Sequence, residues 1–168
     1  QQHRGFEKIC EQTRWLSIHH YIERLNAASA LHNSLTWYMT LEKLTGIEIP
    51  QRAAFLRVIF SELARISDHA VHFAGLASAC GSPPAQHYLQ YGNDLLVNSL
   101  AVVTGKRLFG SPGCIGGMRK DLTSDQLEAL FAAISEAFKL FEDAEKLLID
   151  NRLFYERLAG LAPMESAD

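Results

Sequence analysis

The chain has 168 residues, of which 48% are hydrophobic and 21% charged, and its formal net charge is -3. This length and apolar content suffice to bury one core and favour a single domain. Because the lysines and arginines are scattered rather than gathered in a basic stripe, nucleic acid is excluded as a partner. Charged residues interrupt every long apolar stretch before the roughly 20 residues that a membrane-spanning helix needs; they are Arg57, Glu62, Asp94 and Lys139.

The cysteines Cys10, Cys80 and Cys114 are odd in number and far apart. They form neither a CxxC pair nor a cluster with histidine, so the sequence indicates no disulfide framework and no zinc site. A reducing compartment fits this pattern best. The chain does not begin with Met and its start lacks the apolar segment of a signal peptide. We therefore expect it to be part of something longer.

Helical patterns separated by breakers follow one another along the whole chain, with hardly any alternating strand pattern. The first half predicts a short helix at 5–11, an amphipathic helix at 13–25 and a third helix at 27–45. The third helix should end at Gly46, because glycine most readily adopts the left-handed conformation of a helix C-terminus.

The second half predicts three further long or medium helices and a short terminal one. A proline begins a helix at 50–81, and a second helix follows over 82–105, with Gly92 as its weak point. Thr123 and Gln126 form a capping box for the last long helix, and a short helix follows at 152–158. We predict an all-α, antiparallel bundle of about four long helices with short flanking helices, one helical domain over 1–161 and a frayed tail over 162–168.

The predicted helix at 50–81 carries two patterns. Apolar residues recur every three or four positions, as on a core-facing helix side; they are Phe55, Ile59, Leu63, Ile66, Ala70, Phe73 and Ala77. The same helix carries a file of ionisable side chains spaced so that neighbours can touch: Glu62, Arg65, Asp68, His69 and His72. Two interpretations stay open, a solvated, self-paired face and a polar seam between subunits.

The segment 106–120 (KRLFGSPGCIGGMRK) is the only long irregular stretch. Its glycines and flanking cations are typical of loops that cradle phosphate. The spacing fits neither a P-loop nor a GxGxxG fingerprint, so a loop wedged against a partner is favoured. Within it, Cys114 reads as a small apolar plug rather than as a reactive thiol.

Five segments resemble one family in order and spacing: HRGFEK at 3–8, LEKLTGIEIPQRA at 41–53, RVIFSELARISDH at 57–69, VTGKR at 103–107 and IGGMRKDL at 115–122. The chain resembles the quinone-site, hydrogenase-like subunit of respiratory NADH:quinone oxidoreductase (complex I) and, more distantly, the large subunits of membrane-bound [NiFe] hydrogenases such as formate hydrogenlyase. The resemblance extends to about Leu161 and implies the central helical bundle of that subunit.

The resemblance also says which cofactors to expect. In the hydrogenases a CxxC pair after the position of Arg24 holds nickel, whereas this chain has Asn26 and Ser29 there. Neither residue supplies the thiolate that a soft metal needs, so we expect no metal on this chain. The family implies quinone, together with a [4Fe–4S] cluster held by a neighbouring subunit.

Two sets of site residues follow from the resemblance. The family's quinone-binding tyrosine on the helix before LEKLTG falls at Trp37, with Tyr38 beside it, and both also suit a helix core. The expected subunit interface comprises Glu62, Arg65, Asp68, His69 and Arg119. Other polar positions of the family have changed; an aspartate appears as Ala79, an arginine as Cys114, and the FRERE run falls on 90–94.

We therefore expect a segment of the quinone-site subunit of a membrane-associated NADH:quinone oxidoreductase. Its partners would be an iron–sulfur small subunit and membrane-arm subunits, and its place the cytoplasmic face of the cell membrane or the matrix side of the inner mitochondrial membrane, as a peripheral component. The isolated chain should be inactive. The alternatives are a non-catalytic structural or assembly homologue and a cysteine-less large subunit like that of formate hydrogenlyase.

Overall fold

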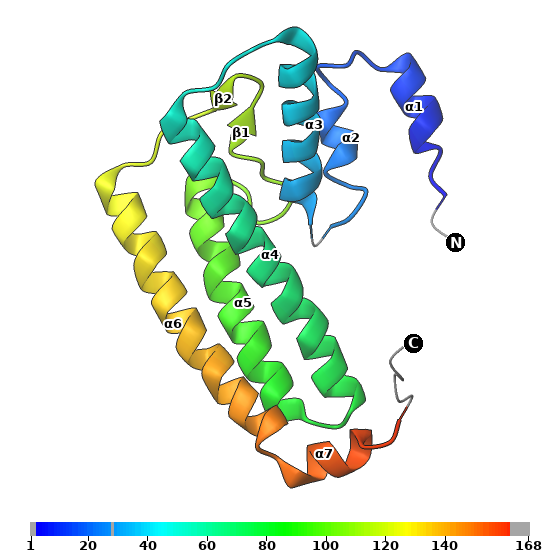
Figure 1. Ribbon diagram of the computed structural model, residues 1–168, viewed down its shortest axis with the longest axis vertical. Coiled ribbons are helices and arrows are strands. Elements are labelled where there is room, and N and C mark those ends of the chain that lie inside the picture. Colours follow the sequence, from blue (N-terminus) through cyan, green and yellow to red (C-terminus); the bar gives the residue numbers. More distant parts are fainter. Residues whose placement is uncertain (1–2, 28, 162–168) are drawn as a thin grey trace, which may run out of the picture.

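The computed structural model describes residues 3–27 and 29–161, which form seven helices and one small hairpin (Figure 1). The tail predicted at 162–168 lies outside the described residues. In chain order the elements are α1 (Phe6–Gln12), α2 (His19–Ile22), α3 (Ala30–Thr45), α4 (Gln51–Ala79), α5 (Pro83–Thr104), β1 (Gly113–Cys114), β2 (Gly117–Met118), α6 (Ser124–Ile149) and α7 (Arg152–Leu158). The all-α prediction is confirmed.

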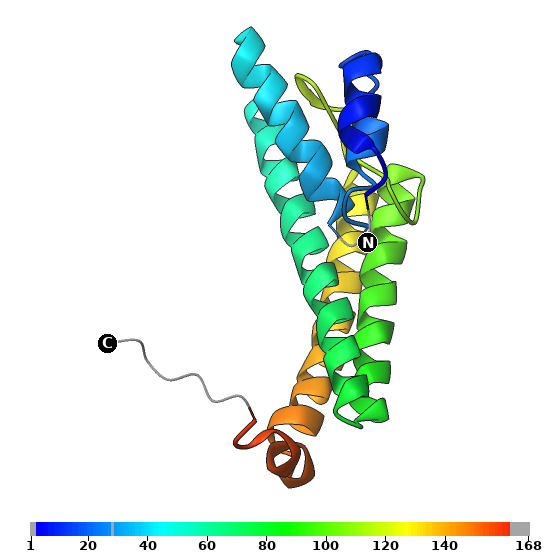
Figure 2. The same ribbon diagram turned by 90° about the vertical axis from the view of Figure 1, so that its right-hand side faces the viewer.

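The long helices α4, α5 and α6 run antiparallel to their chain neighbours and lie side by side in both views (Figures 1 and 2). The shorter α3 lies along the N-terminal half of α4 only, where it also contacts β1. The bundle therefore has three helices at one end and four at the other. No helix in the described part of the chain is long and apolar enough to cross a lipid bilayer.

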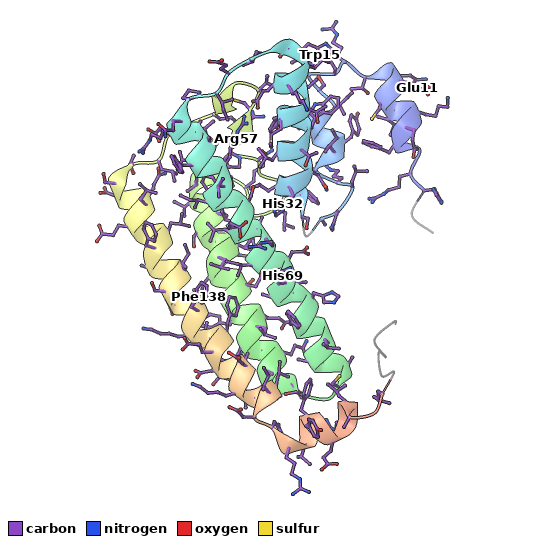
Figure 3. All side chains as sticks on the ribbon, in the orientation of Figure 1. Glu11, Trp15, His32, Arg57, His69 and Phe138 are labelled. Carbon is purple, nitrogen blue, oxygen red and sulfur yellow. The ribbon has the colours of Figure 1, made fainter. Side chains whose placement is uncertain are left out.

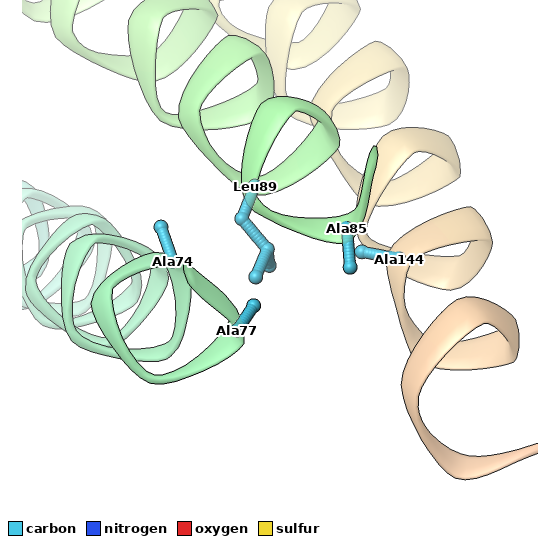
Figure 4. Packing of buried hydrophobic residues seen from close by; sticks show 5 residues of the cluster. All are labelled: Ala74, Ala77, Ala85, Leu89 and Ala144. Carbon is cyan, nitrogen blue, oxygen red and sulfur yellow. The ribbon is translucent and has the colours of Figure 1, made fainter. Parts of the chain in front are cut away.

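The core of the bundle consists of three clusters of buried side chains. Small residues dominate the cluster near the α4–α5 turn, shown in Figure 4: Ala74, Ala77, Ala85, Leu89 and Ala144. The middle cluster is Leu63, Leu96, Leu130 and Ala137, and the cluster at the four-helix end is Leu56, Phe60 and Leu122. Because the distance between packed helices depends on the side chains at the contact, the alanines let these helices approach closely.

The buried face of α4 matches the predicted one in part. Phe55 and Phe73, both predicted to face the core, are 63% and 50% exposed. Leu63, Ala70 and Ala77 of the predicted face are buried, and Ile59 and Ile66 are half-buried and pack against the core. The buried positions that the prediction did not include are Ala53, Leu56, Arg57, Phe60, Ala64 and Ala74. Near the α4–α5 turn the core side of α4 consists of alanines, whereas Leu56, Phe60 and Leu63 fill it farther along the helix. The rings of Phe55 and Phe73 therefore lie at the edge of the interface, and that of Phe60 lies in the core.

The predicted helix ends are mostly confirmed. Gly46 and Gly105 follow α3 and α5 with φ values of 71° and 74°, the left-handed conformation expected at helix C-termini. The capping box before α6 is present, because the Thr123 side chain accepts a hydrogen bond from the Gln126 amide and the Gln126 side chain accepts one from the Thr123 amide.

The predicted helix at 13–25 is wrong in extent. Only α2 is helical there, flanked by turns, and α3 begins at Ala30 rather than at 27. Of the apolar residues thought to form one face, Ile18 and Ile22 are buried, but Trp15 and Leu25 are about half exposed, at 49% and 48%. A short helix gains its stability mainly from packing an apolar face, and this segment packs only its middle.

Helix α5 continues through Gly92, where the sequence predicted a weak point. It is buried in the helix, and a β-carbon there would lie 2.5 Å from Cε1 of Phe141 on α6, whereas Gly75 on α4 has open space around it.

We expect Gly92→Val to destabilise the fold by about 1–3 kcal/mol through overpacking. The matched change Gly75→Val should be neutral within about 0.5 kcal/mol. Urea unfolding of both variants measures this, and equal effects would contradict it.

Candidate functional site

A buried ion pair joins α3 to α4 at the four-helix end. Arg57 and Glu42 are 5% and 7% exposed, and two parallel hydrogen bonds connect them, from Nη1 to Oε2 at 2.8 Å and from Nη2 to Oε1 at 2.6 Å. Such bidentate pairs are strong and fix the geometry of both side chains. Figure 3 labels Arg57 in the N-terminal half of α4.

The same pair holds the glycine-rich segment. Nη2 of Arg57 donates to the carbonyl oxygens of Cys114 and Gly117, at 2.8 and 3.0 Å, and the amide of Gly116 donates to Oε1 of Glu42 at 2.8 Å. The irregular stretch thus contains an antiparallel hairpin, with Gly113 paired to Met118 and Cys114 to Gly117. We predicted that this loop packs against a partner. In the structure it packs within the chain, against α3 and α4.

Two side chains at this end of the bundle, Glu42 and His20, have lowered pKa values. The hydrogen bonds from Arg57 hold the pKa of Glu42 below its usual value, against the opposing effect of burial. The pKa of His20 on α2 is lowered, first by its loss of solvation and then by the neighbouring charge of His19. The Glu42–Arg57 pair is therefore charged at neutral pH.

Trp37 lines a cavity of about 350 Å³ between α1, the α2 segment and α3. The wall is mostly apolar and comprises Phe6, Cys10, Ile18, Ile22, Leu25, Asn33, Thr36, Trp37 and Thr40. Between α3 and the N-terminal half of α4, the 111–118 segment fills the space beside Arg57 and Phe60 and leaves only about 10 Å³ there. The candidate pocket therefore lies on the side of α3 away from α4.

Tyr38 does not share the cavity with Trp37. It is 3% exposed, and its ring lies against the hairpin, 3.4 Å from where a β-carbon on Gly113 would be. The His19 ring is 6.1 Å away, centroid to centroid, and the Tyr38 hydroxyl has no hydrogen-bond partner among the described residues. The structure therefore separates the two predicted quinone-site residues.

The predicted interface residues lie mainly along α4. Glu62 and Arg65 form a salt bridge with each other and are about half exposed. Asp68 accepts a hydrogen bond from the Ser29 hydroxyl at 2.7 Å, and His69 is exposed (Figure 3). Arg119 lies apart, at the end of the hairpin. It donates from Nε to the Gly113 carbonyl oxygen at 3.1 Å, and its Nη2 lies 3.4 Å from Nε2 of His19.

The described residues contain no group of three or more His, Cys, Asp and Glu side chains arranged to hold a metal ion. At one of the positions where the hydrogenases have a nickel-binding cysteine, the Ser29 hydroxyl is bonded to Asp68 instead. The carbonyl oxygen of Cys114 accepts a hydrogen bond from Arg57, and the Cys114 thiol is not part of a disulfide.

Sequence reasoning missed the Arg57–Glu42 pair, although a signal was present. Arg57 lies three or four residues from Ala53 and Phe60, on the side of α4 that the alanines also occupy. A charged residue within such a small-residue stripe needs a buried partner. A second, exposed contact, from Arg52 Nε to both Asp121 oxygens at 2.8 and 2.9 Å, ties the start of α4 to the end of the hairpin segment.

The helical fold is also found in a solved structure. A chain of the membrane-bound sulfane sulfur reductase, an archaeal respiratory membrane complex, superposes with a TM-score of 0.88 at 24% identity, covering 94% of this chain and 43% of that one. This likeness shows the shared helical fold alone.

The chain belongs to the family described as respiratory-chain NADH dehydrogenase, 49 Kd subunit, which matches residues 81–168. A D-type subunit of the NADH-quinone oxidoreductase of Sorangium cellulosum is 34% identical over 99% of this chain and 41% of that protein. The D-type subunit of the same enzyme from Myxococcus xanthus is 36% identical over 99% of this chain and 40% of that protein. This confirms the resemblance, and the chain spans about two fifths of the length of these relatives.

Proposed function

We propose that this chain is the central helical part of a quinone-site subunit in a membrane-associated NADH:quinone oxidoreductase. In this role it contributes a pocket for the quinone and a docking surface for an iron–sulfur subunit with a [4Fe–4S] cluster. The observation that carries the proposal is the family match, together with the NADH-quinone oxidoreductase relatives that align over 99% of the chain. Membrane-arm subunits are the further partners, and attachment is peripheral, on the cytoplasmic or matrix side.

The exposed side of α4 supports the docking role. Large apolar and charged residues follow one another along it every three or four positions, and all are exposed: Phe55, Val58, Glu62, Arg65, His69, His72 and Leu76. This is the spacing by which one helix packs against another. The apolar residues at both ends of this row suit a subunit contact, and the Glu62–Arg65 pair between them would enter that contact as a paired charge.

A non-catalytic structural or assembly role is the second candidate. Two replacements favour it, Ser29 at the position of a nickel-binding cysteine of the hydrogenases and Ala79 at the position of an aspartate of the family. The Ser29 hydroxyl is also occupied, because it donates a hydrogen bond to Asp68. The docking surface of α4 serves either role. A cysteine-less large subunit like that of formate hydrogenlyase would likewise use this surface without nickel.

Arg65→Leu is the test of the docking surface. If α4 binds the small subunit, the change should weaken association by about 3–5 kcal/mol, because Glu62 is left unpaired in a desolvated contact. The isolated chain should keep its stability within about 0.5 kcal/mol, since the pair is then solvated. Binding of the coexpressed iron–sulfur subunit and urea unfolding are the two measurements.

The matched control for that experiment is Arg152→Leu on α7. Arg152 also forms an exposed pair on its own helix, with Glu156, and its side chain is 89% exposed. It should change neither association nor stability. Equal association of the Arg65→Leu and unsubstituted chains would reject α4 as the docking surface. The purified chain alone should oxidise no NADH and reduce no quinone, because the [4Fe–4S] cluster that supplies the electrons is expected on another subunit.

A further inference from the structure

The tip of the four-helix end brings three segments together that are far apart in the sequence. In both ribbon views the C-terminal ends of α1 and α3 and the turn of the hairpin lie at the same end of the long axis, and Figure 3 labels Trp15 there. A β-carbon on Gly116, in the hairpin turn, would lie 3.7 Å from Cγ2 of Ile47, which follows α3. We call this surface, made of residues 14–16, 43–48 and 115–120, the hairpin tip.

Large apolar side chains of the hairpin tip are exposed. Trp15 and Leu16, in the loop after α1, are 49% and 56% exposed, and Leu44 and Ile47, at the end of α3 and just after it, are 79% and 44% exposed. Exposed apolar groups that gather at one place mark a surface that binds a protein or a membrane. Tryptophan is enriched where lipid meets water, because its ring is apolar and its N–H is polar.

The charges of the hairpin tip are mostly positive. Its three segments hold one acidic residue, Glu48, and four cations: Arg14, Lys43, Arg119 and Lys120. All four cations are exposed, and none of them forms a salt bridge within the part of the chain that the structure describes. The adjacent Arg52 adds no net charge, because it pairs with Asp121. The tip therefore presents free positive charge around its apolar side chains.

The opposite end of the molecule, formed by the end of α6 and by α7, has the opposite charge. Residues 142–157 hold five acidic residues and three cations. All three cations are engaged, because Lys146 and Arg152 pair with acidic residues on their own helices and Arg157 donates to the carbonyl oxygens of Cys80 and Gly81. The chain is thus polarised along its long axis, so an anionic surface attracts the hairpin tip and repels the other end.

We infer that the hairpin tip binds directly to an anionic lipid surface, with Trp15 and Leu44 among the lipid headgroups and Lys43 and Lys120 beside the phosphates. Exposed Trp and Leu side chains flanked by lysine and arginine are typical of surfaces that lie on a membrane without crossing it. The choice of a membrane rests on the proposed function, in which attachment is peripheral. The inference adds which surface makes the contact and which lipid charge it requires.

Binding of the full chain to vesicles tests the role of charge. The vesicles consist of phosphatidylcholine alone or of phosphatidylcholine and phosphatidylglycerol in equal amounts, and we expect binding to require the anionic lipid and to weaken with added salt. Lys43→Gln combined with Lys120→Gln should weaken binding by about 5-fold for each cation removed. The matched control is Lys139→Gln combined with Lys146→Gln, which removes the same charge from α6 and should change binding by no more than about twofold.

Trp15 fluorescence in a Trp37→Phe background tests the apolar contact. We expect a blue shift on binding to the anionic vesicles and quenching by lipids that are brominated in their acyl chains. If Trp37→Phe does not fold, Leu44→Ser in the otherwise unsubstituted chain tests the same contact, since Leu44 is exposed and the change leaves the core intact. It should weaken vesicle binding about 3- to 10-fold, as expected for a leucine that is only partly buried among the headgroups.

Three results would overturn the inference: no binding to the anionic vesicles, equal effects of the two double substitutions, or binding with neither Trp15 quenching nor an effect of Leu44→Ser. A double substitution at Lys43 and Lys120 that leaves vesicle binding unchanged but weakens association with coexpressed membrane-arm subunits would also overturn it, in favour of an acidic protein partner. If the iron–sulfur subunit still associates through α4 in any of these cases, the docking proposal stands without the lipid contact.

Discussion

Replacing Arg57 by methionine is expected to destabilise the chain by about 3–5 kcal/mol, the usual effect of removing one partner of a buried ion pair. The change leaves the Glu42 carboxylate buried without its counter-charge, and it removes the donor to the carbonyl oxygens of Cys114 and Gly117. Methionine matches the length of the arginine stem, so little volume is lost. Urea unfolding measures the free energy, and hydrogen exchange at the Gly116 amide reports on the hairpin.

Arg65→Met is the matched control for Arg57→Met, since both arginines lie on α4 and pair with a glutamate. The Arg65 side chain is 58% exposed and that of Arg57 is 5% exposed. Surface pairs contribute about 0–1 kcal/mol, so Arg65→Met should change stability little. If the two variants unfold at the same urea concentration, the buried pair does not hold the hairpin in place.

The long helices could be predicted because their signals are local. Gly46 and Gly105 mark helix ends by backbone conformation, and Thr123 with Gln126 marks a helix start by its own hydrogen bonds. Each of these signals is complete within a few residues, so no tertiary contact is needed to read it.

The predictions failed in the segments whose secondary structure depends on tertiary packing. The segment 13–25 has the apolar spacing of a helix, but the bundle provides a surface only for Ile18 and Ile22. The hairpin at 113–118 has strands of two residues each, too short for any alternating pattern. Two hydrogen bonds between distant parts of the sequence hold it. The one from Arg57 to Cys114 spans 57 residues, and the one from Gly116 to Glu42 spans 74 residues.

The candidate site shows the same division. The sequence placed Trp37 on the right helix, and the structure puts this side chain in a mostly apolar cavity beside α3. Which side of the helix it faces depended on the 111–118 segment, which fills the space toward α4.

Glu42→Gln is expected to destabilise the chain at neutral pH by about 3 kcal/mol, near the lower end of the range for a broken buried pair. The glutamine can still accept a hydrogen bond from Arg57, but the buried guanidinium loses its counter-charge. The control is Glu62→Gln, which alters the exposed pair with Arg65 and should change stability by no more than about 0.5 kcal/mol.

The pH dependence separates a role of the Glu42 charge from a role of its shape. Arg57 lowers the pKa of Glu42 in the folded chain below the value of 4.5 expected in the unfolded chain. A carboxyl group with a lowered pKa stabilises the fold fully above its unfolded pKa, and this contribution is lost as the pH falls through the folded value. The stability difference between the unsubstituted chain and Glu42→Gln should therefore be constant from neutral pH down to about pH 4.5 and should shrink below it. Urea midpoints at a series of pH values test this, and a difference that stays constant to the lowest pH at which both chains fold would mean that the side chain acts through its packing and not through its charge.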